Sequence, residues 1–135
     1  MYIVKITQVC KLGLEKPLFE MARVGFFDEY EIYIHTDDTG KIPHFHLWDA
    51  GTKGNKFHTC IRIDKSEYFH HTGKEDVLNT NDKKDLCKFL SDKPKNKRYE
   101  TYWEYLVSMW NDNNSDVEIP EDQSMPDYTM LPNKK

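Results

Sequence analysis

The sequence predicts an α+β fold: a small, mostly antiparallel sheet of three to five strands, two helices packed on one face, and an extended C-terminal tail. Three observations support this. Residues 29–64 alternate apolar and polar side chains between turn-forming segments. Residues 80–91 and 99–111 carry apolar side chains at helical spacing. Residues 117–135 contain prolines that interrupt regular structure. We therefore expect one domain over residues 1–116, followed by a tail over 117–135.

The strands before residue 29 are less regular. Residues 2–9 are rich in β-branched side chains and predict a first strand. Residues 18–24 fit either a short strand or an irregular crossing, and Gly25 is expected to end it. Residues 37–41 have a turn composition, so the strands on either side are expected to form an antiparallel hairpin.

The alternation also predicts which side chains share a face, because successive side chains of a strand point to opposite sides. With the apolar sets turned inward, the core face holds Ile32, Ile34, Phe45, Leu47, Ile61 and Ile63. The opposite face collects Glu31, Tyr33, His35, His44, His46, Trp48, His58, Cys60 and Arg62. A single β-bulge within this region would reverse the assignment.

Two helices follow these strands. Thr80 or Asn81 is expected to cap the first helix, with Leu86, Phe89 and Leu90 facing inward. The second helix carries one apolar stripe, formed by Tyr99, Trp103, Leu106, Val107 and Trp110. Its two tryptophans are interpreted as core anchors rather than as a platform for stacking bases.

Charge and composition limit the partners. The net charge is −4, which argues against a general polyanion-binding surface. A local basic run, residues 93–98, fits either a solvated loop or a contact with nucleic acid. The run reads Lys93, Pro94, Lys95, Asn96, Lys97 and Arg98. No apolar stretch is long enough to span a bilayer and no signal peptide is evident, so we expect no membrane partner and a cytoplasmic location.

The positions of the histidines indicate a candidate functional site on the sheet. His44 and His46 lie two residues apart on a strand that follows Pro43. No cofactor is expected in the first place. If the face holds one, His44 and His46 with His35 or His58 across the sheet match a histidine site for zinc or another divalent metal. The predicted metal ligands are therefore His35, His44, His46 and His58.

Two other interpretations of these histidines stay open. His44 and His46 are the catalytic candidates for metal-free RNA cleavage, one as base and one as acid. Arg62, Lys41 or Lys56 would stabilise the developing charge. Alternatively, the imidazoles only hydrogen-bond within the fold. A cysteine–histidine nucleophile is not indicated, and Cys60 is expected to pack as a small hydrophobic side chain.

The run Pro43-His44-Phe45-His46 resembles the small bacterial domain-of-unknown-function family marked by a Pro-Pro-His-Phe-His strand. The resemblance spans about residues 29–110 and includes the helix start at Trp103-Glu104. Ile42 stands where that family carries its first proline. The resemblance implies a strand–turn–strand order backed by helices, and an origin in toxin–antitoxin systems, phage or other mobile elements.

Together these features favour a protein that acts mainly through protein–protein interaction, with a histidine-lined sheet face and a protein partner. The tail either wraps the domain or is a peptide that another chain binds. The alternative is a toxin-like, histidine- or metal-dependent nuclease or hydrolase that uses His44 and His46.

Overall fold

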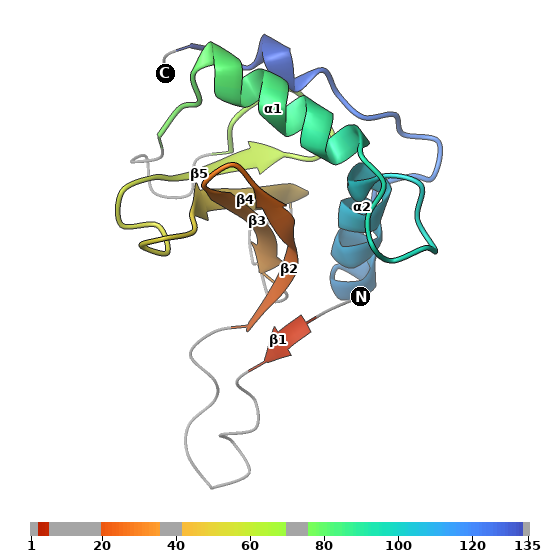
Figure 1. The fold of residues 1–135 in the computed structure, drawn as a ribbon. Coiled ribbons are helices and arrows are strands. Elements are labelled where there is room, and N and C mark those ends of the chain that lie inside the picture. The colour runs from red at the N-terminus through yellow and green to blue at the C-terminus, as the bar shows by residue number, and fades with distance from the viewer. Residues whose placement is uncertain (1–2, 6–19, 36–41, 70–75, 134–135) are drawn as a thin grey trace, which may run out of the picture.

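The computed structural model describes residues 3–5, 20–35, 42–69 and 76–133, and confirms the α+β class (Figure 1). Five antiparallel strands form one sheet in chain order. They are β1 (Ile3–Lys5), β2 (Glu20–Phe27), β3 (Tyr30–His35), β4 (His44–Asp49) and β5 (His58–Arg62). The predicted turn over residues 37–41 lies outside the described residues.

Gly25 does not end the second strand, contrary to expectation. β2 continues through it to Phe27, with a register shift against β3 between Arg23 and Gly25. A β-bulge absorbs the extra residue and keeps the ladder running on either side. Gly25 is needed because a Cβ atom there would lie 2.7 Å from Cζ of Phe89. The glycine thus allows a close approach of the helix side chain instead of breaking the strand.

The two predicted faces of β3, β4 and β5 are confirmed by the register. Ile32 lies opposite Leu47, and Phe45 lies opposite Ile61. The six predicted core residues are all fully buried: Ile32, Ile34, Phe45, Leu47, Ile61 and Ile63. The bulge falls in β2, outside these three strands, so it does not reverse the alternation within them.

The first helix, α1 (Thr80–Ser91), has the predicted length, but its cap is Asn79 rather than Thr80 or Asn81. Asn79 has extended backbone angles, and its side-chain oxygen accepts a hydrogen bond of 2.7 Å from Asp82 N. Helix α2 (Tyr102–Asn113) begins later than the predicted Tyr99 because Thr101 caps it, accepting from Glu104 N. Neither helix, nor any other in the described part of the chain, is long and apolar enough to span a membrane.

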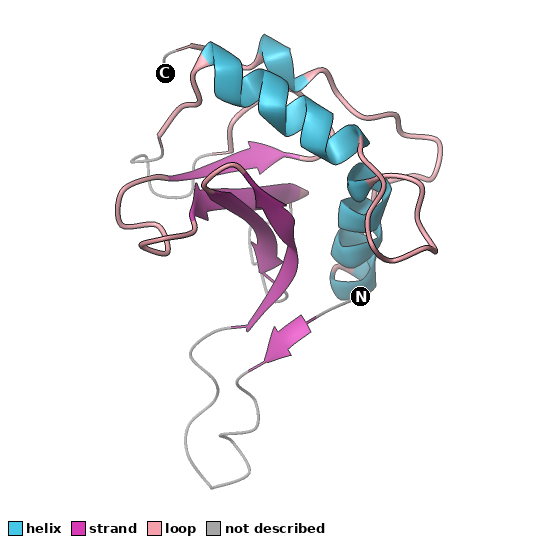
Figure 2. Ribbon diagram, viewed as in Figure 1, coloured by secondary structure: helices cyan, strands magenta, loops and turns pink. Residues whose placement is uncertain are grey.

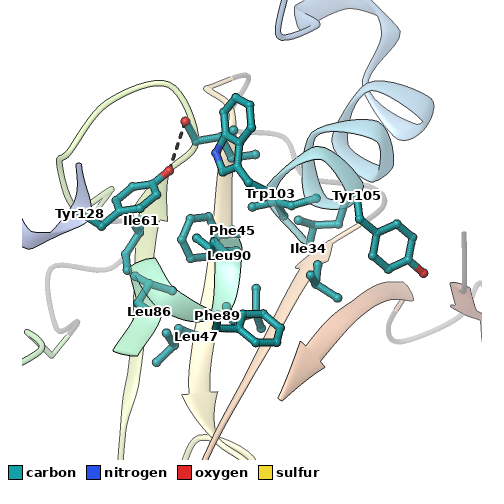
Figure 3. Packing of buried hydrophobic residues seen from close by; sticks show 14 of the residues in the cluster. Ile34, Phe45, Leu47, Ile61, Leu86, Phe89, Leu90, Trp103, Tyr105 and Tyr128 are labelled. Atoms are coloured by element: carbon teal, nitrogen blue, oxygen red, sulfur yellow. Dashed lines mark hydrogen bonds between the residues drawn. The ribbon is translucent and has the colours of Figure 1, made fainter. Parts of the chain in front are cut away.

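Both helices contribute to one core on one face of the sheet, as the layers in Figure 2 show. Leu86, Phe89 and Leu90 of α1 are buried against the sheet, as predicted (Figure 3). Trp103 and Trp110 of α2 are 7% and 0% exposed, which confirms them as core anchors.

The described part of the tail packs against the domain, so of the two expected alternatives the structure has the wrapped one. Its short helix η3 (Tyr128–Met130) lies beside α1 (Figure 1). The fully buried Tyr128, labelled in Figure 3, has its hydroxyl 2.9 Å from Arg62 O and 3.2 Å from Ile63 O, and it donates its hydrogen to these carbonyls. Lys83 Nζ donates to Leu131 O at 2.6 Å and to Asn133 Oδ1 at 2.7 Å. These bonds attach the tail to both β5 and α1.

Candidate metal centre

The side of the sheet opposite the apolar core residues is named the histidine face, and α2 reaches its edge, where the Trp110 ring lies 5.7 Å from the His44 ring. Its described members are Glu31, Tyr33, His35, His44, His46, Trp48, His58, Cys60 and Arg62. The register sets the neighbours on this face. His46 lies between Tyr33 of β3 and Cys60 of β5, and the next pair along β5 is Trp48 with His58. His46 is therefore the centre of the face.

Three side chains on this face converge, and we call them the His–His–Cys cluster: His46, His58 and Cys60. His46 Nδ1 lies 3.1 Å from His58 Nε2 and 3.3 Å from Cys60 Sγ. All three potential ligand atoms lie within 4.8 Å of one another. Cys60 was not among the predicted ligands. The signal was present, because the spacing His58-x-Cys60 puts both side chains on one face of β5.

These separations can be compared with a tetrahedral zinc site. With Zn–N of about 2.0–2.1 Å and Zn–S of about 2.3 Å, two ligand nitrogens lie about 3.3–3.4 Å apart, and a nitrogen and a sulfur about 3.6 Å apart. The observed distances of 3.1 Å and 3.3 Å are slightly shorter. They also suit hydrogen bonds, with the roles set by the imidazole tautomers. A tetrahedral ion would therefore require His46 Nδ1 to lie about 0.2–0.3 Å farther from each of the other two atoms.

The cluster is largely shielded from solvent. Cys60 is fully buried and His46 is 5% exposed, whereas His58 is half-buried. A buried sulfur cannot be reached by a large substrate, so the short distance to His46 does not make Cys60 a nucleophile. A buried free cysteine packs as a small hydrophobic side chain when it is a neutral thiol. The burial therefore argues against covalent catalysis by Cys60.

Ring packing orients His46. Its imidazole lies nearly parallel to the Tyr33 ring, at 4.9 Å between centroids and 16° between planes. It is also nearly parallel to the His58 ring, at 5.4 Å and 6°. Main-chain bonds fix His58 in turn, because His58 N donates to Asp76 Oδ2 at 3.0 Å and Asp76 N donates to His58 O at 2.9 Å. Asp76, in the segment before α1, thus positions His58, and Tyr33 of β3 positions His46.

His44 and His35, two of the predicted ligands, flank the cluster rather than join it. The His44 and His35 rings lie 5.2 Å and 4.5 Å from the His46 ring, between centroids. His44 is fully buried, and its Nδ1 lies 2.6 Å from Ile42 O, so that nitrogen carries the hydrogen and donates it. Phe69 covers the His44 ring at 4.5 Å. His70 and His71 lie outside the described residues.

Each charged member of the histidine face, Glu31 and Arg62, has a charged partner of opposite sign. The carboxylate of Glu31, 4% exposed, forms an ion pair with Arg23 and accepts a 2.9 Å hydrogen bond from Trp48 Nε1. Arg62 was the candidate for stabilising a phosphorane. Its guanidinium bonds to Asp64 at 2.9 Å, and this hydrogen bond is the main cause that raises the pKa of Arg62. Both cations thus have carboxylate partners within the fold.

No protein-family model, curated protein or solved structure matches this chain. The resemblance built on Pro43 to His46 consequently stays a prediction. Function has to be inferred from the side chains of the histidine face themselves.

Proposed function

We propose that this protein binds a divalent transition-metal ion, zinc in the first place, through His46 Nδ1, His58 Nε2 and Cys60 Sγ. The observation that carries the proposal is the convergence of these three atoms within 4.8 Å on one rigid sheet face. Ligands on strands are held more precisely than ligands on loops. Adjacent strands β4 and β5 supply all three.

The donor set favours zinc over magnesium or calcium. Two neutral imidazoles and one thiolate are soft or borderline ligands, whereas magnesium and calcium prefer oxygen. The thiolate also offsets part of the charge of a divalent ion, which lowers the cost of burying it. Copper and cobalt share these preferences, so the bound metal depends on availability as well as on ligand type.

A metal-dependent hydrolase is the activity that such a site supports best. Three protein ligands leave a fourth coordination position on a tetrahedral ion, which catalytic zinc sites use for water. Among the described residues, three groups converge here. His58 on β5 is the most exposed of the three ligands, so solvent reaches the cluster from its side. A metal-free reaction that uses His44 and His46 is less well supported, because His44 Nδ1 is already bonded to Ile42 O and Arg62 is paired with Asp64.

An interaction protein with an open histidine face is also less well supported. Tyr33, His44, His46 and Cys60 are all buried, so little of their surface is offered to a partner. The tail, the other predicted contact, is packed on β5 and α1. A protein partner stays a prediction that these contacts do not favour.

Elemental analysis of the purified, untagged protein tests the metal proposal. We expect close to one zinc ion per chain in the wild type, and loss of most of it in His58→Ala and in Cys60→Ser. His35→Gln is the matched control, since it alters a histidine beside His46 but outside the cluster, and it should retain the metal. Circular dichroism verifies that each variant is folded. A folded wild type that stays metal-free after refolding with zinc would rule the proposal out.

Cobalt substitution identifies the ligands. Co²⁺ bound by a thiolate gives a charge-transfer absorption that Cys60→Ser should abolish and His35→Gln should preserve. Hydrolysis of an activated phosphodiester by the zinc form, lost on chelation and in His58→Ala, would support the hydrolase assignment. One metal ion per chain without such activity would support the metal-binding proposal and contradict the hydrolase assignment.

A further inference from the structure

We propose that a groove between β2 and the basic loop binds a segment of single-stranded nucleic acid. We call it the basic–aromatic groove. It is lined by Arg23, Val24, Gly25, Phe26, Pro94, Lys95, Asn96, Tyr102 and Tyr105. The proposal is independent of the metal centre, because none of these residues belongs to the His–His–Cys cluster.

The groove has the size of a ligand site. Its volume is about 420 Å³, within the range of roughly 300–1,000 Å³ that small-molecule sites occupy. One wall is the C-terminal half of β2, beyond the residues that pair with β1. The other wall is the loop between α1 and α2, together with the first turn of α2. Segments about seventy residues apart in sequence thus form one hollow.

The β2 wall has an exposed aromatic ring at its outer rim, where Phe26 pairs with Glu31 and so belongs to the sheet face opposite Gly25. Phe26 is 55% exposed, which is unusual for a phenylalanine on a strand next to a full core. The guanidinium carbon of Arg23 lies 5.8 Å from the centre of this ring. A ring with a nearby cation is the arrangement on which single-strand binders stack successive bases. Tyr102 extends the aromatic surface on the opposite wall.

The loop wall supplies unpaired positive charge. Lys95, Lys97 and Arg98 are exposed, and no ion pair neutralises them within the described part of the chain. Lys93 differs, because its Nζ lies 3.7 Å from Glu100. Lys95 lines the groove, and Lys97 and Arg98 follow it in the same loop, in a chain with a net charge of −4. They match the negative charge of a phosphodiester backbone.

The loop is held in shape, so the groove exists before a ligand arrives. Pro94 is buried, and Arg98 N donates to Asn96 Oδ1 at 3.0 Å. Tyr102 N donates to Asp92 O at 2.8 Å, which closes the loop at the base of both helices. The Tyr102 ring stacks on Phe89 of α1 at 4.2 Å. A preformed site avoids much of the ordering cost of binding.

The positive charge and the aromatic rings of the groove together indicate which class of ligand it binds. An acidic peptide would satisfy the cations but leave Phe26 without a partner. A duplex offers phosphates, yet its base faces are stacked inside the helix. A single strand offers both phosphates and free base faces. RNA and DNA share this chemistry, and a comparison of the two in one binding assay distinguishes them.

Fluorescence anisotropy with labelled oligothymidylate and oligouridylate of about ten nucleotides, a length within the site sizes of single-strand binders, tests the proposal on the full chain. We expect Phe26→Ala to weaken binding by about tenfold. The triple variant Lys95→Gln/Lys97→Gln/Arg98→Gln should weaken it further and reduce the salt dependence. The slope of log K against log salt should fall by about 0.7 for each phosphate that the variant no longer neutralises. Tighter binding of one oligonucleotide identifies RNA or DNA as the source.

Matched controls separate the groove from general charge effects. Lys84→Gln removes an exposed lysine on α1, outside the groove, and should leave binding unchanged. A duplex of the same length and a polyglutamate peptide should bind more weakly than the single strands. The proposal fails if neither single strand binds, if Phe26→Ala has no effect in a folded variant, or if polyglutamate binds as tightly. It also fails if Lys84→Gln matches the effect of the triple variant.

Discussion

The two faces of the sheet are both buried, yet they are held by different interactions. The core face packs apolar side chains such as Phe45 and Leu47 under the helices. The histidine face buries polar groups, among them Glu31, His44 and His46. Apolar burial is non-directional and tolerates many arrangements. Buried polar groups need partners with defined geometry, so the histidine face specifies particular atom pairs rather than mere contact. Such specificity is what a metal site requires.

The largest expected effect is on the core face. Leu47 is fully buried, and Leu47→Ala should lower the free energy of unfolding by about 2–5 kcal/mol, because it leaves a cavity that neighbours fill only in part. Urea unfolding measures it. Leu131→Ala on the tail, 3% exposed, gives a comparison at the rim of the same core. A loss below that of Leu131→Ala would contradict the assignment of Leu47 to the centre of the core.

Removing the metal should lower the stability of the native state through the histidine face. If zinc is in about hundredfold excess over its dissociation constant, binding stabilises the native state by about 2.7 kcal/mol. A chelator should therefore lower the melting temperature of the wild type and of His35→Gln. It should leave Cys60→Ser unchanged, because that variant lacks one ligand. Equal responses of the wild type and Cys60→Ser would show that the cluster is held by hydrogen bonds only.

The pair formed by Glu31 and Arg23 tests the polar side of the comparison without a metal. Glu31→Gln keeps an acceptor for Trp48 Nε1 but removes the charge that faces Arg23. We expect a loss of about 1–3 kcal/mol, at the lower end because Arg23 is 36% exposed and can be solvated. Chemical denaturation measures the loss. Arg23→Gln should cost more than Glu31→Gln, because it leaves the buried carboxylate charged without its cation, whereas Glu31→Gln leaves an arginine that water can solvate. The reverse order would show that the bond from Trp48 is enough to stabilise the carboxylate.

The smallest effect concerns the turn that joins β4 to β5. The hydrogen bond from the Thr52 hydroxyl, followed by main-chain bonds such as that from Phe57 N, lowers the pKa of Asp49 to about 2. Because the pKa is lower in the folded state, the stabilisation is complete above the unfolded value of about 3.9 and is lost as the pH falls through about 2. Asp49→Asn should flatten the dependence of stability on pH over this window. An acid titration followed by circular dichroism measures it, and an unchanged slope would contradict the assignment.

Sequence reasoning found most of the candidate site but not its ligand set. His46 and His58 were expected as ligands and converge, whereas Cys60 joins them in place of His35 and His44. Period-two alternation predicts that these side chains share a face. It does not predict which ring atoms meet, because that depends on register and on side-chain rotamers. The sequence also could not predict how far the histidine face is exposed to solvent. The residues that cover it, such as Phe69, come from later in the chain.

What the sequence by itself determined is local: the strands, the two helices, their inward residues, and the gathering of histidines on one side of the sheet. Each of these follows from backbone periodicity, which acts over a few neighbouring residues. The tertiary structure alone decided the bulge at Gly25, the docking of Tyr128, and the meeting of Phe26 with the loop that carries Lys95. These depend on contacts between segments far apart in the chain. Such contacts are set by packing and by pairing of polar groups, and no short-range pattern encodes them.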